Sequence, residues 1–549
     1  MANREAVVGV SPSNQTRREF LGRVGGAAAL AVAAESAFAE TETNLNGGSS
    51  SAMSKSELIA RRQAAFELRV RRARTWLFEP LDLPRHNGDE SRYPTKIGNF
   101  SKGLPHDELG QVDTSAYSTF VRACKSGRVR DFDAIPLGSD GGQPLRNPQA
   151  GLAFMVSGAD SHQITIPPPP PFASAELAGE MVELYWMSLA RDVPFSDYDT
   201  SPIIQQAIGE LSANPPVTPQ TIFRAPYPGA TVGPFVSQFL LQPFAFGAQP
   251  IEQRIRTFEG GVDFLTSFPD WLARQNGAPF APRQYDSTLR YIRNGRDLAA
   301  WVDADPPSQA GLNALLILFG MGCPLDSANP YGQRITNQDA FTTFGPVDLF
   351  DMVEKAPAPA HRAGWFQKWR VHRYLRPEEY GGRVHNQLVG SASYPLPDDV
   401  LGSSAVQQVF SETGSYLLPQ AYPDGCPLHP AYPSGHSVGS GSTATMLKAV
   451  FDESFVIPNP VEASADGLSL VPYSGPPLTV GGELNKLAFN IGIARVFAGI
   501  HFRSDVIWGN RVGEAVSLGL LADEAGCYNE PFRGYSLRKF DGSVVTAGD

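Results

Sequence analysis

Residues 484–521 read LNKLAFNIGIARVFAGIHFRSDVIWGNRVGEAVSLGLL and predict two helices joined by a short turn. Residues 484–497 and 506–521 contain no proline, and their apolar side chains recur at helical spacing. Gly499 lies between them and lets the chain turn at the end of the first helix. This stretch therefore favours a helical fold.

Helical patterns occur along much of the remaining chain. Ser174 is placed as an N-cap, and the apolar residues on one face of the helix after it are Leu177, Met181, Leu184 and Tyr185. Further helices are predicted over residues 57–77, 262–273, 284–302, 310–321, 363–374 and 435–451. Alternation of period two, which is typical of strands, is scarce. We expect an all-α fold, with one large helical-bundle domain over residues 56–549 and long loops.

The composition excludes some classes of protein. The chain has 549 residues with 45 Lys and Arg against 56 Asp and Glu, and this net charge of −11 argues against nucleic-acid binding. An apolar content of 42% excludes a wholly disordered chain. The 53 glycines and 47 prolines predict long loops, above all over residues 78–172, which we expect to wrap the surface.

Cysteine usage excludes several kinds of site. No two cysteines form a C-x-x-C pair, so zinc and iron–sulfur sites built on thiolates are not expected. Three full disulfide pairings stay open for the four cysteines, which are Cys124, Cys323, Cys426 and Cys527.

The N-terminus resembles a bacterial twin-arginine export signal. Arg17 and Arg18 precede a mildly apolar stretch that ends in Ala37-Phe38-Ala39, a sequence typical of a cleavage site. We expect a signal over residues 1–39, a polar linker over 40–55, and a periplasmic or extracellular mature protein. No apolar run is long enough for a transmembrane segment.

Candidate chemistry begins with the stretch KWRVHRYLRP, residues 368–377. On one continuous helix, Lys368 and Arg376 would lie on broadly the same side and could face one point. The alternative is a solvated basic helix face that stops at Pro377.

A second stretch, HPAYPSGH over residues 429–436, leads directly into a predicted helix. Ser434 and Gly435 at a helix start offer a hydroxyl, free backbone N–H groups and the positive end of the helix dipole, which together suit an oxyanion. An ordinary N-cap would explain Ser434 but neither His429 nor His436. A serine-hydrolase elbow is disfavoured because the G-x-S-x-G pattern is missing.

The third stretch is RVFAGIHFRSD, residues 495–505, in which Arg495 precedes His501 by six residues. The turn at Gly499 would let both side chains reach one pocket, although a lone histidine is often structural. No H-E-x-x-H zinc motif is present.

Taken as one site, the three stretches fit a compact, multiply charged, tetrahedral oxyanion. Lys368, Arg376 and Arg495 supply cations, and Ser434 and Gly435 supply neutral donors. A neutral His501 imidazole could bond to the central atom of the anion. His436 could exchange protons with an apical oxygen.

The set K-x7-R-P, P-S-G-H and R-x5-H resembles the vanadium-dependent haloperoxidases, which share a site with certain acid phosphatases and lipid phosphatases. Upstream segments are similar to the bromoperoxidases of red and brown algae and their bacterial relatives: residues 105–108 (PHDE), 147–152 (NPQAGL) and 161–162 (SH). The resemblance therefore covers most of the chain from about residue 57.

This resemblance implies a vanadate cofactor with His501 as the axial ligand to vanadium. The residues that would hold the vanadate oxygens are Lys368, Arg376, Ser434, Gly435 and Arg495. It implies catalytic roles for His436 as the acid–base residue, for Lys368 in polarising bound peroxide, and for His429, whose presence favours bromide. Trp365 would line the halide pocket together with His429, as a hypothesis.

The implied activity is that of an oxidoreductase, a bromide peroxidase that uses hydrogen peroxide. A hypobromous-acid equivalent would brominate small organic acceptors, and iodide and chloride are further candidate halides. A homo-oligomer is implied as well. The rival function is a soluble acid phosphatase that forms a phosphohistidine at His501, and a non-catalytic anion-binding protein is a third.

Overall fold

The computed structural model describes residues 53–139, 142–212, 216–332 and 334–548. The described residues divide into two units, before and after the boundary between Glu67 and Leu68. The described part of the first unit, residues 53–67, contains the beginning of α2 (Lys55–Phe78), which confirms the helix predicted over 57–77. The predicted export signal, and all but the last three residues of the predicted linker, lie outside the described residues.

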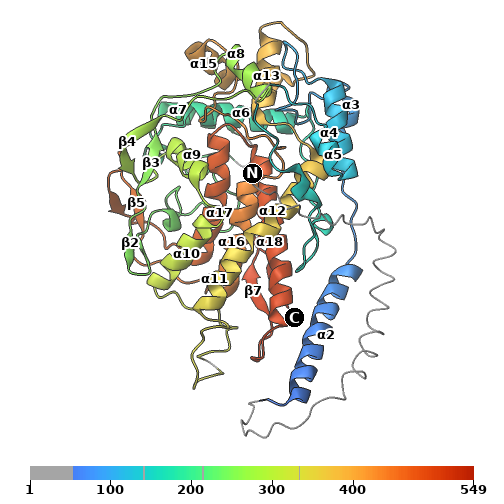
Figure 1. Ribbon diagram of the computed structural model, residues 1–549. Coiled ribbons are helices and arrows are strands. Elements are labelled where there is room, and N and C mark those ends of the chain that lie inside the picture. The colour runs from blue at the N-terminus through green and yellow to red at the C-terminus, as the bar shows by residue number, and fades with distance from the viewer. Residues whose placement is uncertain (1–52, 140–141, 213–215, 333, 549) are drawn as a thin grey trace, which may run out of the picture. The chain divides into compact units, whose positions relative to one another are not determined.

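The centre of the second unit is a group of four helices that Figure 1 shows side by side: α12 (Pro357–Trp365), α16 (Gly435–Val450), α17 (Val480–Phe497) and α18 (Arg503–Ala525). α16 packs against each of the other three. Every residue of α17 is buried, as expected for a helix without a polar face. The predictions over 435–451, 484–497 and 506–521 are confirmed.

Small residues let α16 and α18 approach closely. A Cβ atom on Gly441 would lie 2.6 Å from the Cα atom of Asn510, and one on Gly513 would meet the carbonyl oxygen of Val438. Any larger side chain at either position would push the two helices apart, so the glycine-rich sequence sets the spacing of the bundle.

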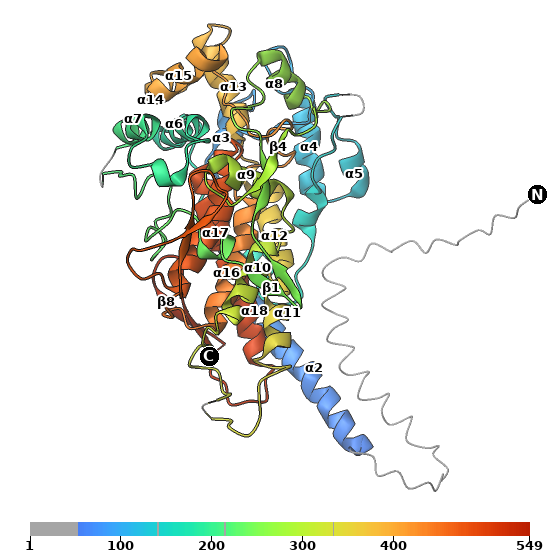
Figure 2. The ribbon, with the colours of Figure 1, turned by 90° about the vertical axis from the view of Figure 1, so that its left-hand side faces the viewer.

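A second group of helices lies near the end of the bundle where the site is found. α6 (Ala175–Leu189) packs against α7 (Pro202–Leu211), α14 (Asp398–Leu401) and α15 (Ser404–Thr413), and the two views in Figures 1 and 2 agree on this grouping. Ser174 caps α6 by accepting a hydrogen bond from the Leu177 backbone N–H, as predicted.

Strands form only four two-stranded antiparallel hairpins among the described residues. The pairs are β1 (Phe244–Phe246) with β2 (Gln249–Ile251), β3 (Ile255–Phe258) with β4 (Tyr285–Arg290), β5 (Val461–Ala463) with β6 (Leu470–Pro472), and β7 (Tyr535–Arg538) with β8 (Val544–Ala547). The fold is all-α, as expected.

Two predicted helices have the wrong start. The helix predicted over 284–302 begins only at Gly295 as α9 (Gly295–Ala304), because residues 285–290 pair with β3 and Asn294 caps the helix. The helix predicted over 262–273 is α8 (Phe268–Gln275), which begins after the Ser267 side chain caps the Asp270 N–H. In both cases a local cap decides the boundary.

Residues 78–172 do more than wrap the surface, so that prediction is wrong in part. α4 (Thr114–Ser126) contributes Tyr117 and Phe120 to a separate hydrophobic cluster with Phe100 and Trp369. The edges of the Phe100 and Phe120 rings meet Trp369 at centroid distances of 5.8 and 5.7 Å. This stretch therefore buttresses the segment that carries Lys368.

The remaining helical elements complete the described part of the fold. They are α3 (Asp89–Arg92), α5 (Val129–Asp133), α10 (Gln309–Gly320), α11 (Pro346–Lys355), α13 (Pro377–Leu388), the 3-10 helices η1 (Pro148–Leu152), η2 (Ser161–Gln163), η3 (Phe195–Asp197) and η4 (Gln238–Leu240), and the π-helix η5 (Phe366–His372). No helix in the described ranges is long and apolar enough to cross a membrane.

All four cysteines lie in described ranges and are unpaired. Cys527 is exposed, whereas Cys124, Cys323 and Cys426 are buried.

Candidate active site

Lys368 and Arg376 do not lie on one helix, which corrects the prediction. Lys368 belongs to the π-helix η5, and the chain leaves this helix at Arg373, whose φ is 44°. Arg376 is the N-cap of α13, so Pro377 starts a helix instead of stopping one. Both cations are fully buried, which also rules out the alternative of a solvated basic face.

Arg376 joins the three predicted stretches. Its Nη1 atom donates to the Ile500 carbonyl at 2.8 Å and lies 3.0 Å from His501 Nε2. Its Nη2 atom lies 2.9 Å from His429 Nδ1, and its Nε atom donates to the His429 carbonyl at 2.9 Å. Because a guanidinium only donates, His501 Nε2 must be the acceptor of its contact with Arg376.

Lys368 has only neutral oxygen partners. Its Nζ atom donates to the carbonyls of Pro430 and Ala431, both at 2.7 Å. The same Nζ lies 5.8 Å from the centroid of the Trp365 ring. Lys368 therefore places a buried positive charge against the HPAYPSGH loop.

Arg495 is only partly satisfied. Its Nη1 atom donates to the Val302 carbonyl and to the Tyr422 hydroxyl, each at 3.2 Å, and its guanidinium lies over the Tyr422 ring. Its Nε atom is buried and has no hydrogen-bond partner among the described residues. An unused donor on a buried cation is what a bound anion would satisfy.

Asp505 links the histidine stretch to the helix start, and sequence reasoning missed it. Its Oδ2 atom lies 2.7 Å from His501 Nδ1, and its backbone carbonyl accepts a hydrogen bond from the Ser434 N–H at 2.8 Å. The Asp505 carboxylate therefore fixes the proton of His501 on Nδ1 and leaves Nε2 with its lone pair. The sequence feature that could have indicated this contact is the spacing His-x-x-x-Asp at the start of a helix.

Ser434 and Gly435 begin α16 as predicted. Ser434 is fully buried and is the N-cap of the helix. A Cβ atom on Gly435 would lie 3.3 Å from the Trp365 ring, so glycine makes room there for the indole. His436 follows in the first turn, and its Nε2 atom lies 3.2 Å from Asp305 Oδ1, a second partner that the sequence did not reveal.

Trp365 and His429 lie together, as the halide-pocket hypothesis requires. Their ring centroids are 5.0 Å apart with an interplanar angle of 37°. The Trp365 indole N–H donates to the Arg146 carbonyl at 3.2 Å. The predicted pocket residues are therefore adjacent to Arg376 and Lys368, which touch His429 and Trp365.

Burial and neighbouring cations keep the imidazoles neutral. Burial lowers the pKa of His501 well below its ordinary value, and Arg376, Lys368 and Arg495 lower it further. Burial and the same cations lower the pKa of His429. Burial and Arg376 also hold the pKa of Lys368 well below its usual range. A neutral His501 is the form that can bind a metal.

The residues present fit a small oxyanion such as vanadate. No carboxylate of the described chain forms an ion pair with Lys368, Arg376 or Arg495. Buried charges are normally paired, so three unpaired cations around one imidazole call for an anion.

A helical bundle with this arrangement defines a class of enzymes that hold a tetrahedral oxyanion between buried cations and a histidine. Residues 349–523 match the family model for the second helical-bundle domain of VCPO. Relatives that are 34–36% identical over nearly nine-tenths of the chain show that it belongs to the vanadium-dependent bromoperoxidase family.

Several relatives support that assignment. The vanadium-dependent bromoperoxidase of Ascophyllum nodosum is 36% identical over 518 residues, which cover 88% of this chain and 91% of the relative. That of Corallina officinalis is 34% identical over 590 residues, covering 89% and 98%. The homohexameric structure of the second vanadate-dependent bromoperoxidase from Ascophyllum nodosum matches with a TM-score of 0.85 and 30% identity, covering 94% of this chain and 97% of that one.

Proposed function

We propose that this chain is a vanadium-dependent bromoperoxidase that oxidises bromide with hydrogen peroxide. The observation that carries the proposal is the group of three buried cations without carboxylate partners, gathered around the neutral His501 in a chain of this family. Bound vanadate would supply Lewis-acid activation of peroxide without a change in the oxidation state of the metal.

His501 would bind the vanadium through Nε2. Asp505 holds the other ring nitrogen, Nδ1, so the orientation of the imidazole is set before the cofactor arrives. Arg376 Nη1 lies against His501 Nε2 and would exchange this hydrogen bond for one to the oxyanion. This exchange costs little because the guanidinium keeps its bonds to Ile500 and His429.

The remaining donors would hold the vanadate oxygens. Lys368, Arg376 and Arg495 supply charge-assisted hydrogen bonds, and Ser434 Oγ and the Gly435 N–H supply neutral ones at the N-terminus of α16. These groups are in place in advance, so little reorganisation accompanies the rise of negative charge during the reaction. Lys368 Nζ would also polarise an oxygen of the peroxide.

His436 is the acid–base residue in this proposal. It lies beside Gly435 at the start of α16, with Nε2 toward Asp305, and it takes up a proton of hydrogen peroxide. His429 and Trp365 would form the wall on which bromide is held, since their tilted, adjacent rings border Lys368 and Arg376.

The product would be a hypobromous-acid equivalent that brominates small organic acceptors; iodide and chloride are further halides. We also propose a homo-oligomer, because the similar structure from Ascophyllum nodosum is homohexameric. Export by the twin-arginine signal, with a periplasmic or extracellular location, is proposed from the sequence of residues 1–39 alone.

The test is a bromination assay on purified protein with and without orthovanadate. We expect peroxide- and bromide-dependent turnover only after vanadate loading, and a loss of about 100-fold or more in His436→Ala. The matched control is His385→Ala, a half-buried histidine on α13 with no contact to the site. Phosphatase turnover without vanadate, and no bromination with it, would instead indicate the phosphohistidine enzyme.

A further inference from the structure

A cavity of about 170 Å³ lies next to His436. Its polar wall is formed by Asp305, His361, His436, Ser440 and Thr443. Ser440 and Thr443 are on α16 beyond His436, so the cavity extends from His436 along that helix. A polar space of this size holds several water molecules.

His361 faces this cavity with a defined proton arrangement. It is a half-buried residue of α12, and its Nδ1 atom lies 2.7 Å from the Pro357 carbonyl. A carbonyl only accepts, so Nδ1 carries the proton and Nε2 has the free lone pair. His361 is thus a proton acceptor on the wall of the cavity.

The main chain of α16 is shaped to receive the His361 ring. Gly439 lies three residues after His436, and a Cβ atom there would be 3.0 Å from His361 Cε1. That distance is closer than ordinary carbon contacts, so an alanine would displace the ring. The ring position is therefore fixed by the absence of a side chain at residue 439.

We propose that His361 receives, through the water of this cavity, the proton that His436 takes from hydrogen peroxide. His436 Nε2 faces the Asp305 carboxylate and already carries a proton, so the proton from peroxide adds to Nδ1. The His436 Nε2–H bond then breaks and the His361 Nε2–H bond forms, with water carrying the proton across and no change of oxidation state. His361 then returns the proton to solvent. This proposal rests on the proposed bromoperoxidase function and names a further proton-transfer residue for it.

The surroundings of His361 suit a transient acceptor. The ionisable groups that act on it are His436, Lys368 and Asp305. Burial lowers the pKa of His361, the Pro357 carbonyl raises it, His436 and Lys368 lower it, and Asp305 raises it, with a net lowering. The His361 imidazole is therefore neutral before a proton reaches it, and its lowered pKa favours release of that proton to solvent.

The main variant is His361→Asn, because an asparagine amide can still donate to the Pro357 carbonyl while the Nε2 acceptor is lost. In the vanadate-loaded enzyme we expect turnover to fall about tenfold, less than for direct loss of an acid–base residue. Vanadate affinity, measured by equilibrium dialysis, should not change. Added imidazole should restore turnover, and His385→Asn, a histidine remote from the site, should behave as wild type.

A second variant guards against misfolding. Gly439→Ala keeps the imidazole but pushes it from its place, so turnover should fall in the same direction without rescue by imidazole. If His361→Asn and Gly439→Ala both turn over as fast as wild type at low buffer concentration, the relay is disproved. A wild-type enzyme inactive with vanadate would overturn the proposed function instead.

A readout independent of turnover is the protonation state of His361. In protein labelled with ¹⁵N-histidine, nine imidazoles are present and the His361→Asn spectrum identifies the missing one. We expect a neutral ring with the proton on Nδ1 at pH 7. A proton on Nε2, or a charged ring, would overturn the proposal even if turnover were lowered.

Discussion

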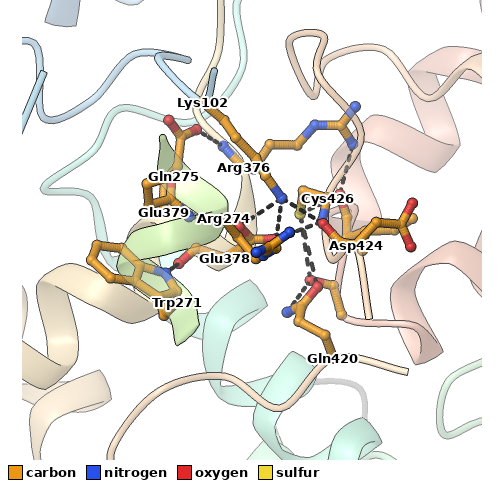
Figure 3. Close-up of polar contacts among 12 residues, drawn as sticks. Lys102, Trp271, Arg274, Gln275, Arg376, Glu378, Glu379, Gln420, Asp424 and Cys426 are labelled. Atoms are coloured by element: carbon orange, nitrogen blue, oxygen red, sulfur yellow. Dashed lines mark hydrogen bonds and ion pairs between the residues drawn. The ribbon is translucent and has the colours of Figure 1, made fainter. Parts of the chain in front are cut away.

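Lys102 and Lys368 are two fully buried lysines with opposite surroundings. Lys102 Nζ lies 2.8 Å from Glu378 Oε1 and donates to the Asp424 carbonyl at 2.8 Å, and Gln275 donates to the same carboxylate at 2.6 Å (Figure 3). Lys368 meets two carbonyls and no carboxylate. One charge is balanced within the protein, and the other is left for a ligand.

The difference teaches how to separate structural charges from functional ones. The Glu378 cluster ties α13 to Lys102 and to Cys426, whose N–H contacts the same carboxylate, and every partner is protein. Three cations of the candidate site have no such partner among the described residues. Burial alone does not mark a binding site; burial without compensation does.

Breaking the balanced cluster should have the largest effect. Lys102→Met leaves the Glu378 carboxylate buried without its cation, so we expect a loss of about 3–5 kcal/mol in the free energy of unfolding, measured with urea. Adding Glu378→Gln should recover most of that loss. Lys539→Met, which removes a partly exposed partner of Asp541, should cost less than about 1 kcal/mol. A loss that small for Lys102→Met would contradict the comparison.

At the candidate active site, where the buried cations have no carboxylate partner, a lysine substitution should affect ligand binding more than stability. Lys368→Met removes one of three mutually repelling cations, so we expect the free energy of unfolding of the vanadate-free protein to change by less than about 1 kcal/mol. Vanadate affinity, measured by equilibrium dialysis, should fall about 100-fold, because a charge-assisted hydrogen bond in a buried site is lost. A strongly destabilised variant that binds vanadate normally would show that Lys368 is structural.

Glu180 extends the comparison from buried lysines to a buried acidic side chain near the site. Glu180 of α6 accepts hydrogen bonds from the backbone N–H and the hydroxyl of Ser504, each at 2.9 Å. Burial, followed by the nearby Asp505, raises the pKa of Glu180 from 4.5 to about 8. Between these values the folded protein keeps a proton that the unfolded chain releases, so this residue makes stability fall as pH rises from about 4.5 to 8.

We therefore expect Glu180→Gln to reduce the loss of melting temperature between pH 5 and pH 8. The control is Glu176→Gln, an exposed position on the same helix, which should leave the pH dependence unchanged. The result is checked by thermal unfolding of the vanadate-free protein. A steeper loss in Glu180→Gln than in wild type would show that Glu180 is ionised in the folded state.

The sequence predicted the site better than it predicted the path of the chain through the site. The three motifs meet as expected, because Arg376 of the first motif contacts His429 of the second and His501 of the third. The break between Lys368 and Arg376 escaped prediction, since it depends on the left-handed conformation of Arg373, which the fold imposes. β4 was missed because its pairing partner lies about thirty residues away.

The partners of the site residues also escaped prediction. Asp305, Tyr422 and His361 come from three separate segments, and only folding brings them to His436 and Arg495. Asp505 is only four residues after His501 in the sequence. Its contact with His501 can be predicted only when the start of α18 at Arg503 is known.

Asp505 contacts both the start of α16 and the His501 imidazole. Its main-chain oxygen holds Ser434 and its side-chain oxygen holds His501, so the gap between helix start and imidazole is spanned by a few covalent bonds. The distance between the two oxygen atoms of Asp505 is set by covalent geometry, so it changes little when neighbouring helices shift. The dimensions of the cradle should thus survive amino-acid changes elsewhere in the bundle that alter its packing.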